Sequence, residues 1–340
     1  MADTSQGAYR SQLDTLRFVA FLGVWLFHAN EQRFTPGSLG VPLFFVLSGF
    51  LITRILILNE SGSLFQELLT FYGRRTLRIF PLYYAVLLVL LVVGMLPNPL
   101  WYFFYLHNVY IFLHDAWTGP TNHFWSLCVE EQFYLLYPLL LLLTPARFRW
   151  TLLGALLAGS VLSRLTLDWY YPGSRAWALL PVSGEYLLWG CLAGLADLHL
   201  PERSYSWLVA LGAGLVCATG LDFYHLRWLG AWGLHLLYQS LFGVGFTLIL
   251  FGTWRLPDGW WLRLLCLPPI VYLGRISYGL YVFHNFFYGI KPWLVEWLPP
   301  LRVIPAPALA LATTILMAVL SWHLFEAPIN RLKERLSYRR

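Results

Sequence analysis

Two acidic residues stand inside an apolar stretch of this sequence that is long enough to cross a membrane. Glu130 and Glu131 come shortly after Trp125, and the apolar run continues through Leu143. Charge in the hydrocarbon core of a bilayer is expensive, so a carboxylate kept there needs a partner, a water-filled cavity or a role in function. The stretch therefore predicts a polar site inside a membrane.

An arginine and a histidine repeat this anomaly near the N-terminus. Arg17 and His28 lie in the apolar run LRFVAFLGVWLFHAN. On a helix the two fall nearly in line on one face, with His28 about 16 Å further along the axis. A neutral histidine can take a proton from a hydroxyl, and a carboxylate can hold its second nitrogen. We therefore predict that His28 is a general base and that Glu130 supports it.

Plainer interpretations of the same residues stay open. His28 would also suit the interfacial end of a helix, and Glu130 would suit an ion pair with Arg164, which is expected at a similar depth. Glu131 lies about 100° around the helix from Glu130, so we expect only one of the two to face the site.

The composition indicates what kind of protein must hold these residues. Of 340 residues, 58% are hydrophobic and 12% are charged, against about 25% charged residues in soluble domains. Apolar runs separated by polar or Pro/Gly breaks predict an all-α polytopic bundle, as a single domain over 1–340 with no fused soluble domain. About ten spans are expected, over residues 14–30, 39–58, 79–96, 124–144, 150–167, 176–197, 205–221, 231–253, 268–290 and 303–325. The aromatic stretch 101–113 is too short for a span and is expected to be interfacial or re-entrant.

The basic residues predict the orientation of the bundle. With the N-terminus inside, sixteen Lys and Arg residues fall in inner loops and tails, and five fall in outer loops. Both termini are therefore expected in the cytoplasm, with the protein in a bacterial cytoplasmic membrane. The net charge of +6 comes from these helix ends, so we expect the lipid bilayer and no nucleic acid as a partner.

This orientation sorts the polar residues into two layers. His28 and Glu130 fall in the outer half of the membrane, where the ninth span adds His284 and Asn285. Ser48 lies nearer the middle.

The second layer is cationic and lies at the cytoplasmic mouth, with Arg17, Arg75 and Arg78. Arg75 and Arg78 are three residues apart and can share a helix face. Forked guanidinium groups suit a phosphate-bearing ligand, although the alternative is that both are ordinary positive-inside residues. A thin donor with phosphates at one end and a reactive group at the other would join the layers, and acyl-coenzyme A has that shape.

The residues of the two layers resemble the motifs of a known family, the transmembrane acyltransferases of the acyltransferase-3 group. Each motif alone is weak, but the set covers nearly the whole chain in the expected order. The motifs are the Arg17/His28 pair, the segment FFVLSGF around Ser48, the Arg75/Arg78 pair followed by Phe80-Pro81-Leu82-Tyr83-Tyr84, Trp125-Ser126-Leu127 with Glu130, Phe133, Tyr134 and Pro138, the segment ISYGLYVFH ending at His284, and Phe325-Glu326-Ala327-Pro328.

The resemblance implies a multi-span enzyme that moves acyl groups, commonly acetyl from acetyl-coenzyme A, to hydroxyls of sugars or other acceptors. It implies His28 as the catalytic group, and motif position favours Glu130 over Glu131. For donor binding it implies Arg17, Arg75 and Arg78, to which we add Ser48. We expect the acceptor to contact Trp125, Ser126, Tyr134, His284 and Asn285.

Several alternatives bear on this prediction. A transporter or flippase would also keep buried Arg, Glu and His as a proton or substrate path, although no inverted repeat with broken helices is visible. The sequence has no Gly-x-Ser-x-Gly elbow, which disfavours a covalent serine enzyme. Its four cysteines show no metal-ligand spacing, so we expect no metal. Surface glycan, lipid-linked sugar, peptidoglycan, osmoregulated glucan and small metabolites all fit as the acceptor.

Overall fold

The chain folds into helices. The computed structural model describes residues 10–29, 35–60, 63–196, 199–231, 236–257 and 259–336, and these residues contain no β-strand. The α-helices are α1 (Ser11–Ala29), α2 (Gly40–Leu58), α3 (Leu64–Val92), α4 (Pro99–Phe103), α5 (His107–His114), α6 (Phe124–Leu143), α7 (Arg149–Tyr170), α8 (Leu180–Leu195), α9 (Glu202–Leu221), α10 (Trp228–Ala231), α11 (Leu237–Arg255), α12 (Trp260–Leu265), α13 (Pro268–Arg275), α14 (Ser277–Phe283), α15 (Lys291–Trp297), α16 (Ala306–Ser321) and α17 (Ala327–Arg331). The predicted all-α fold is confirmed.

Seven helical segments of the described chain are long and apolar enough to cross a membrane, which supports an integral membrane protein. They are Thr35–Leu58, Leu64–Val92, Phe124–Leu143, Ala146–Tyr170, Glu202–Leu226, Leu237–Arg255 and Ala306–Arg335. The three other expected spans coincide with α1, α8 and the pair α13–α14. Of these, α1 carries Gln12, Asp14 and Arg17, α8 has only 16 residues, and α13 ends at Arg275 before α14 begins. The number of ten spans and the orientation of the termini stay predictions.

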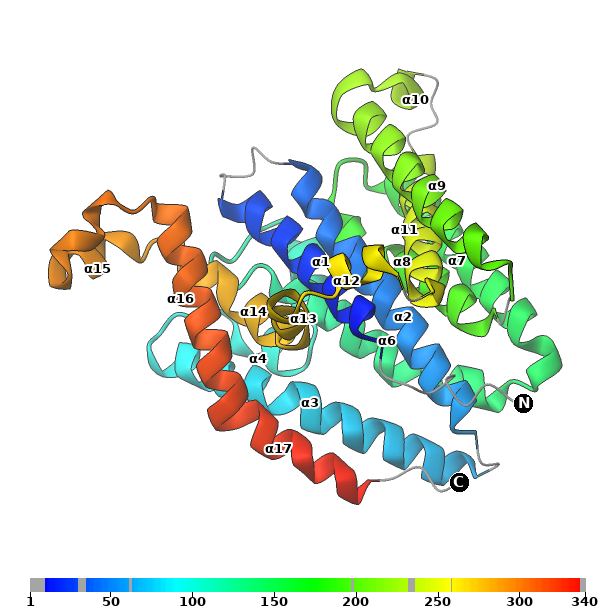
Figure 1. Cartoon of the computed structure of the whole chain (residues 1–340), viewed down its shortest axis with the longest axis horizontal. Helices are drawn as coiled ribbons and strands as arrows, with labels where there is room; N and C mark the ends of the chain where they lie inside the picture. Colours follow the sequence, from blue (N-terminus) through cyan, green and yellow to red (C-terminus); the bar gives the residue numbers. More distant parts are fainter. Residues whose placement is uncertain are drawn as a thin grey trace.

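Helices α1 and α2 run through the middle of the bundle (Figure 1). Helices α7, α9 and α11 lie to one side of them, and α3, α16 and α17 lie to the other (Figure 1). One buried apolar cluster joins α1, α3, α6 and α14, and a second joins α1, α2, α8 and α11. Polar side chains on α1 and α2 are therefore shielded by other helices, which makes charge inside the membrane tolerable.

Close packing of α2 on α8 fixes the position of Ser48. Gly49 lies so near the Leu187 carbonyl that a Cβ atom would collide with it, and Gly190 lies equally close to the Val46 carbonyl. Small residues allow membrane helices to approach in this way. The contact turns the neighbouring Ser48 toward α6, where it meets Glu130.

Helix α3 extends well before the expected third span. Helix α3 begins at Leu64 rather than near residue 79, so the arginines assigned to a cytoplasmic loop are helical. The Arg74 guanidinium donates to the Lys333 and Leu336 carbonyls at 3.2 and 2.8 Å, and Arg75 lies over the Tyr134 ring. These contacts hold the basic turn of the helix against the rest of the bundle.

Two other segments shape the outer end of the site. The aromatic stretch 101–113 folds as α4 and α5, each too short to cross a membrane. The expected ninth span is interrupted at Ile276, between α13 and α14, and a 3-10 turn at His284–Phe286 follows. This turn brings His284 beside α1.

Candidate functional site

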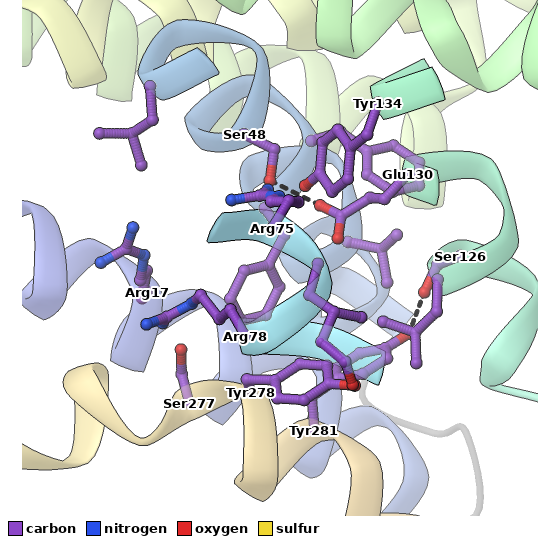
Figure 2. A pocket seen from close by; sticks show the side chains of 16 residues that line it. Arg17, Ser48, Arg75, Arg78, Ser126, Glu130, Tyr134, Ser277, Tyr278 and Tyr281 are labelled. Carbon is purple, nitrogen blue, oxygen red and sulfur yellow. Dashed lines mark hydrogen bonds between the residues drawn. The ribbon is translucent and has the colours of Figure 1, made fainter. Parts of the chain in front are cut away.

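A cavity lies where α1, α2, α3, α6 and α14 meet (Figure 2). Phe44, Phe45, Leu51 and Ile79 are among its apolar lining residues. The polar side chains that line it are Arg17, Ser48, Arg75, Arg78, Ser126, Glu130, Tyr134, Ser277, Tyr278 and Tyr281. The structure therefore brings the three arginines, Ser48, Glu130, Ser126 and Tyr134 around one space, although the sequence analysis placed Glu130 in the layer of His28.

The cationic residues set the character of one side of the cavity. Arg17 and Arg78 lie together there, away from Ser126 and Tyr281 (Figure 2). Arg17 donates to Asp14 at 2.5 Å, and the Arg75 guanidinium lies 3.9 Å from the centre of the Tyr134 ring. Three guanidinium groups and one carboxylate, that of Glu130, line this space, while the nearby carboxylates of Asp14, Glu131 and Glu326 lie outside the lining. The excess positive charge favours an anionic ligand.

The carboxylate of the cavity belongs to Glu130. The Ser48 hydroxyl donates to its Oε1 atom at 2.6 Å (Figure 2). Glu131 is absent from the lining, and its Oε1 atom is buried without a hydrogen-bond partner among the described residues. The side of α6 that faces the cavity is therefore the side of Glu130, as motif position favours.

A hydrogen-bonded pair closes the opposite side of the cavity. The Ser126 and Tyr281 hydroxyls are 2.5 Å apart, and each lies 3.1 Å from the His123 carbonyl. Each hydroxyl has one proton, so one donates to the other, which donates to the carbonyl. The Tyr281 ring contacts Phe44 on one side and the His284 ring on the other, at 5.9 and 5.2 Å between ring centroids. Tyr281 thus stands between the cavity and a group of histidines.

His28 belongs to this histidine group and not to the cavity lining. Its Nδ1 atom lies 2.9 Å from the Val24 carbonyl, and its ring is 5.1 Å from the His284 ring. The His284 ring is 4.8 Å from the His123 ring. His123 immediately precedes α6, and its Nε2 atom donates to the Val282 carbonyl at 3.1 Å. Burial lowers the pKa of His123 to about 3, so this imidazole is neutral at physiological pH.

The direct contact predicted between His28 and Glu130 is not found among the described hydrogen bonds. Glu130 is held at Ser48 on α2, and the nearest ring beside His28 is that of His284 or Phe27, both at 5.1 Å. The depth argument placed the two residues in one layer, but it did not fix where α6 and α14 lie around α1.

The alternative ion pair for Glu130 is wrong. Arg164 on α7 pairs with Glu185 on α8 at 3.0 Å. Glu185 follows Val182, Ser183 and Gly184 on α8, which packs closely on α7. The depth argument alone did not identify α8 as the neighbour of Arg164.

Three predicted acceptor-binding residues lie outside the cavity lining: Trp125, Asn285 and His284, which belongs to the histidine group. The Trp125 ring packs on Phe45 and Trp177, at 6.0 and 4.9 Å between centroids. Asn285 donates to the Pro120 carbonyl at 2.8 Å, which ties the turn after α14 to the loop before α6. Sequence reasoning missed Tyr281 and His123, although Tyr281 is three residues before His284 and so had a visible signal in helical spacing.

Comparison with known proteins gives one consistent result. A family model described as an acyltransferase domain matches residues 10–325. The chain is 28% identical to the peptidoglycan O-acetyltransferase OatA of Listeria monocytogenes, with 95% of this chain and 56% of that protein covered. It is 26% identical to the O-acetyltransferase OatA of Staphylococcus aureus strain NCTC 8325, with 95% and 57% covered. The chain thus spans a little over half the length of these relatives. No solved structure matches it significantly.

Proposed function

Because the chain belongs to the acyltransferase-3 family, we propose that it is a membrane-embedded O-acyltransferase. In this proposal it takes an acyl group, acetyl in the simplest case, from acyl-coenzyme A on the cytoplasmic side. It passes the group to a hydroxyl of a carbohydrate acceptor on the outer side of a bacterial cytoplasmic membrane. The single observation that carries the proposal is the arginine-lined cavity that ends against the histidine group.

The arginines supply the donor site. Arg17, Arg75 and Arg78 come from two different helices and face one space. Guanidinium groups bind phosphates through paired N–H donors, and their charge is strengthened where little water is present. The phosphates of coenzyme A would lie here, with the acyl thioester directed past Ser48 toward Tyr281.

The hydrogen bond of His28 supports its role as a base. A carbonyl oxygen only accepts, so the Nδ1 atom of His28 must carry the proton that it shares with Val24. In the neutral ring the Nε2 atom then keeps its lone pair, which is the form that a general base requires.

The proposed transfer balances without a further reagent. Nε2 of His28 takes the proton of the acceptor hydroxyl as its oxygen attacks the thioester carbonyl. The C–S bond breaks, and the departing thiolate takes the proton back from His28. The products are the O-acyl acceptor and free coenzyme A. Glu130 stays the second catalytic candidate, acting from the cavity wall rather than through a hydrogen bond to His28.

The relatives suggest the acceptor to try first. One of them is named as a peptidoglycan O-acetyltransferase, so we propose a cell-wall glycan hydroxyl as the acceptor class. Both termini lie in the cytoplasm and the chain acts as one transmembrane unit in this proposal.

The test is release of coenzyme A from acetyl-coenzyme A by detergent-purified protein, with peptidoglycan fragments as the acceptor and donor binding measured in parallel. His28→Ala should lower turnover by about 10²- to 10⁴-fold and leave donor binding intact. His323→Ala is the matched control, because that ring is exposed and bonded to Tyr272 at 3.0 Å.

Full turnover in purified His28→Ala would refute the base mechanism. A folded wild-type protein that neither binds acetyl-coenzyme A nor releases coenzyme A would refute the donor, and would favour a transporter.

A further inference from the structure

Three imidazole rings lie in series next to the proposed base. His284 contacts both others, at 5.1 Å from His28 and 4.8 Å from His123 between ring centroids. His28 is partly exposed, whereas His284 is fully buried and His123 nearly so. Burial of three polar rings is costly unless their nitrogens are paired.

The protonated nitrogen of His284 can be identified from its partner. The Nδ1 atom lies 2.6 Å from the Tyr281 carbonyl, so Nδ1 carries the proton and donates it. The Nε2 atom of the neutral ring is then an acceptor. It is buried and has no hydrogen-bond partner among the described residues.

His28 has the same arrangement, with Nδ1 on a carbonyl and Nε2 left as an acceptor. In the resting state two acceptor nitrogens cannot bond to each other. Once His28 takes a proton at Nε2, it becomes a donor. A hydrogen bond of ordinary length between two imidazoles places their centroids about 5 Å apart, and the two rings stand at that separation.

We infer that His284 is a positioning residue that accepts a hydrogen bond from His28 after His28 has taken the acceptor's proton. The inference rests on the proposed function. The proton passes from the acceptor hydroxyl to Nε2 of His28. While it is there, Nε2 of His284 accepts a hydrogen bond from it. The proton then passes to the departing thiolate. The interaction exists only while His28 is charged, so it stabilises the transition state more than the ground state.

The surroundings support a neutral partner of this kind. The other rings around the two histidines are those of Phe21, Phe27, Tyr281 and Tyr288. His123 completes the group from the far side of His284. No carboxylate among the described residues hydrogen-bonds to either ring, and Glu130 is held at Ser48. A charged His28 therefore needs an acceptor, and His284 supplies one.

Two amide substitutions separate this role from a structural one. In His284→Asn the amide nitrogen takes the place of Nδ1 and keeps the bond to the Tyr281 carbonyl, but the acceptor is lost. In His284→Gln the amide oxygen takes the place of Nε2 and keeps the acceptor, but the bond to Tyr281 is lost. We expect kcat to fall about 10- to 100-fold in the Asn variant and only about three-fold in the Gln variant, with the KM for acetyl-coenzyme A unchanged in both.

A structural role predicts the reverse order, because only the Asn variant keeps the bond to Tyr281. Equal losses in both variants, a smaller loss in the Asn variant, or no loss in either would overturn the inference. Donor binding and thermal unfolding of each variant show that it is folded. If wild-type protein releases no coenzyme A, the proposed function itself fails. The role of His284 is judged only from variants of an active enzyme, so the two failures are distinguishable.

Discussion

Two regions of this bundle hold charge inside the membrane, and they do so in opposite ways. Arg164 and Glu185 form a closed pair: the ion pair measures 3.0 Å, the Ser240 hydroxyl donates to Glu185 at 2.5 Å, and Arg164 also donates to the Leu236 carbonyl. In the cavity, three arginines face an open space whose lining holds one carboxylate, that of Glu130.

The difference separates charge that is paired within the protein from charge that faces an open space. Glu185 is fully buried and its charge is compensated within the protein, so no ligand is needed to explain it. The cavity arginines instead line an open space, and of the carboxylates near them Asp14, Glu131 and Glu326 lie outside that lining. Their cost is offset when an anion binds, which is what a donor site requires.

The largest effect should follow from breaking the closed pair. Arg164→Leu or Glu185→Leu leaves one buried charge without its partner and should destabilise the protein by about 3–5 kcal/mol. The double variant should recover most of that loss, because no uncompensated charge remains. Thermal unfolding in detergent measures both, and donor binding by the double variant should match that of wild type, since neither residue lines the cavity. Single variants as stable as wild type would show that the pair is not a structural element.

Substitutions in the cavity should act on affinity rather than on stability. Arg78→Gln and Arg75→Gln should weaken binding of acetyl-coenzyme A by about 10- to 100-fold each. The unfolding temperature should change little in Arg78→Gln and fall in Arg75→Gln, which also loses the contact with the Tyr134 ring. Wild-type affinity should fall as salt is raised, and less steeply in either variant. Arg147→Gln is the matched control, because Arg147 is exposed and lies beside Phe148 outside the cavity. Donor affinity equal to that of the control would refute the arginine site.

Much of the candidate site could be predicted from the sequence, because charged and polar residues within apolar runs are visible there. Charges in apolar runs identified Arg17, Glu130 and His28, and hydropathy predicted the all-α class. What failed depended on packing between helices: α7 against α8 for the partner of Arg164, and α1 against the turn after α14 for the neighbour of His28. Depth along a helix follows from counting residues, whereas the angular order of helices is set by contacts such as Gly49 on Leu187 and Gly190 on Val46. Those contacts join residues far apart in the chain, which periodicity does not reveal.

The smallest expected effect comes from a substitution at Glu130 that changes the charge of the cavity wall and keeps its hydrogen bonding. Glu130→Gln removes the negative charge from the cavity wall, but its amide oxygen can still accept from Ser48. Because the carboxylate opposes an anionic donor, binding of coenzyme A should become roughly two- to five-fold tighter at low salt. Ser48→Ala is the comparison, since it removes the hydrogen bond without changing charge, and it should not tighten binding. Turnover is an independent readout: it should fall in Glu130→Gln if the carboxylate also takes part in the chemistry. Weaker donor binding in Glu130→Gln would mean that the carboxylate holds the arginines in place, and the cavity would then resemble the closed pair instead of contrasting with it.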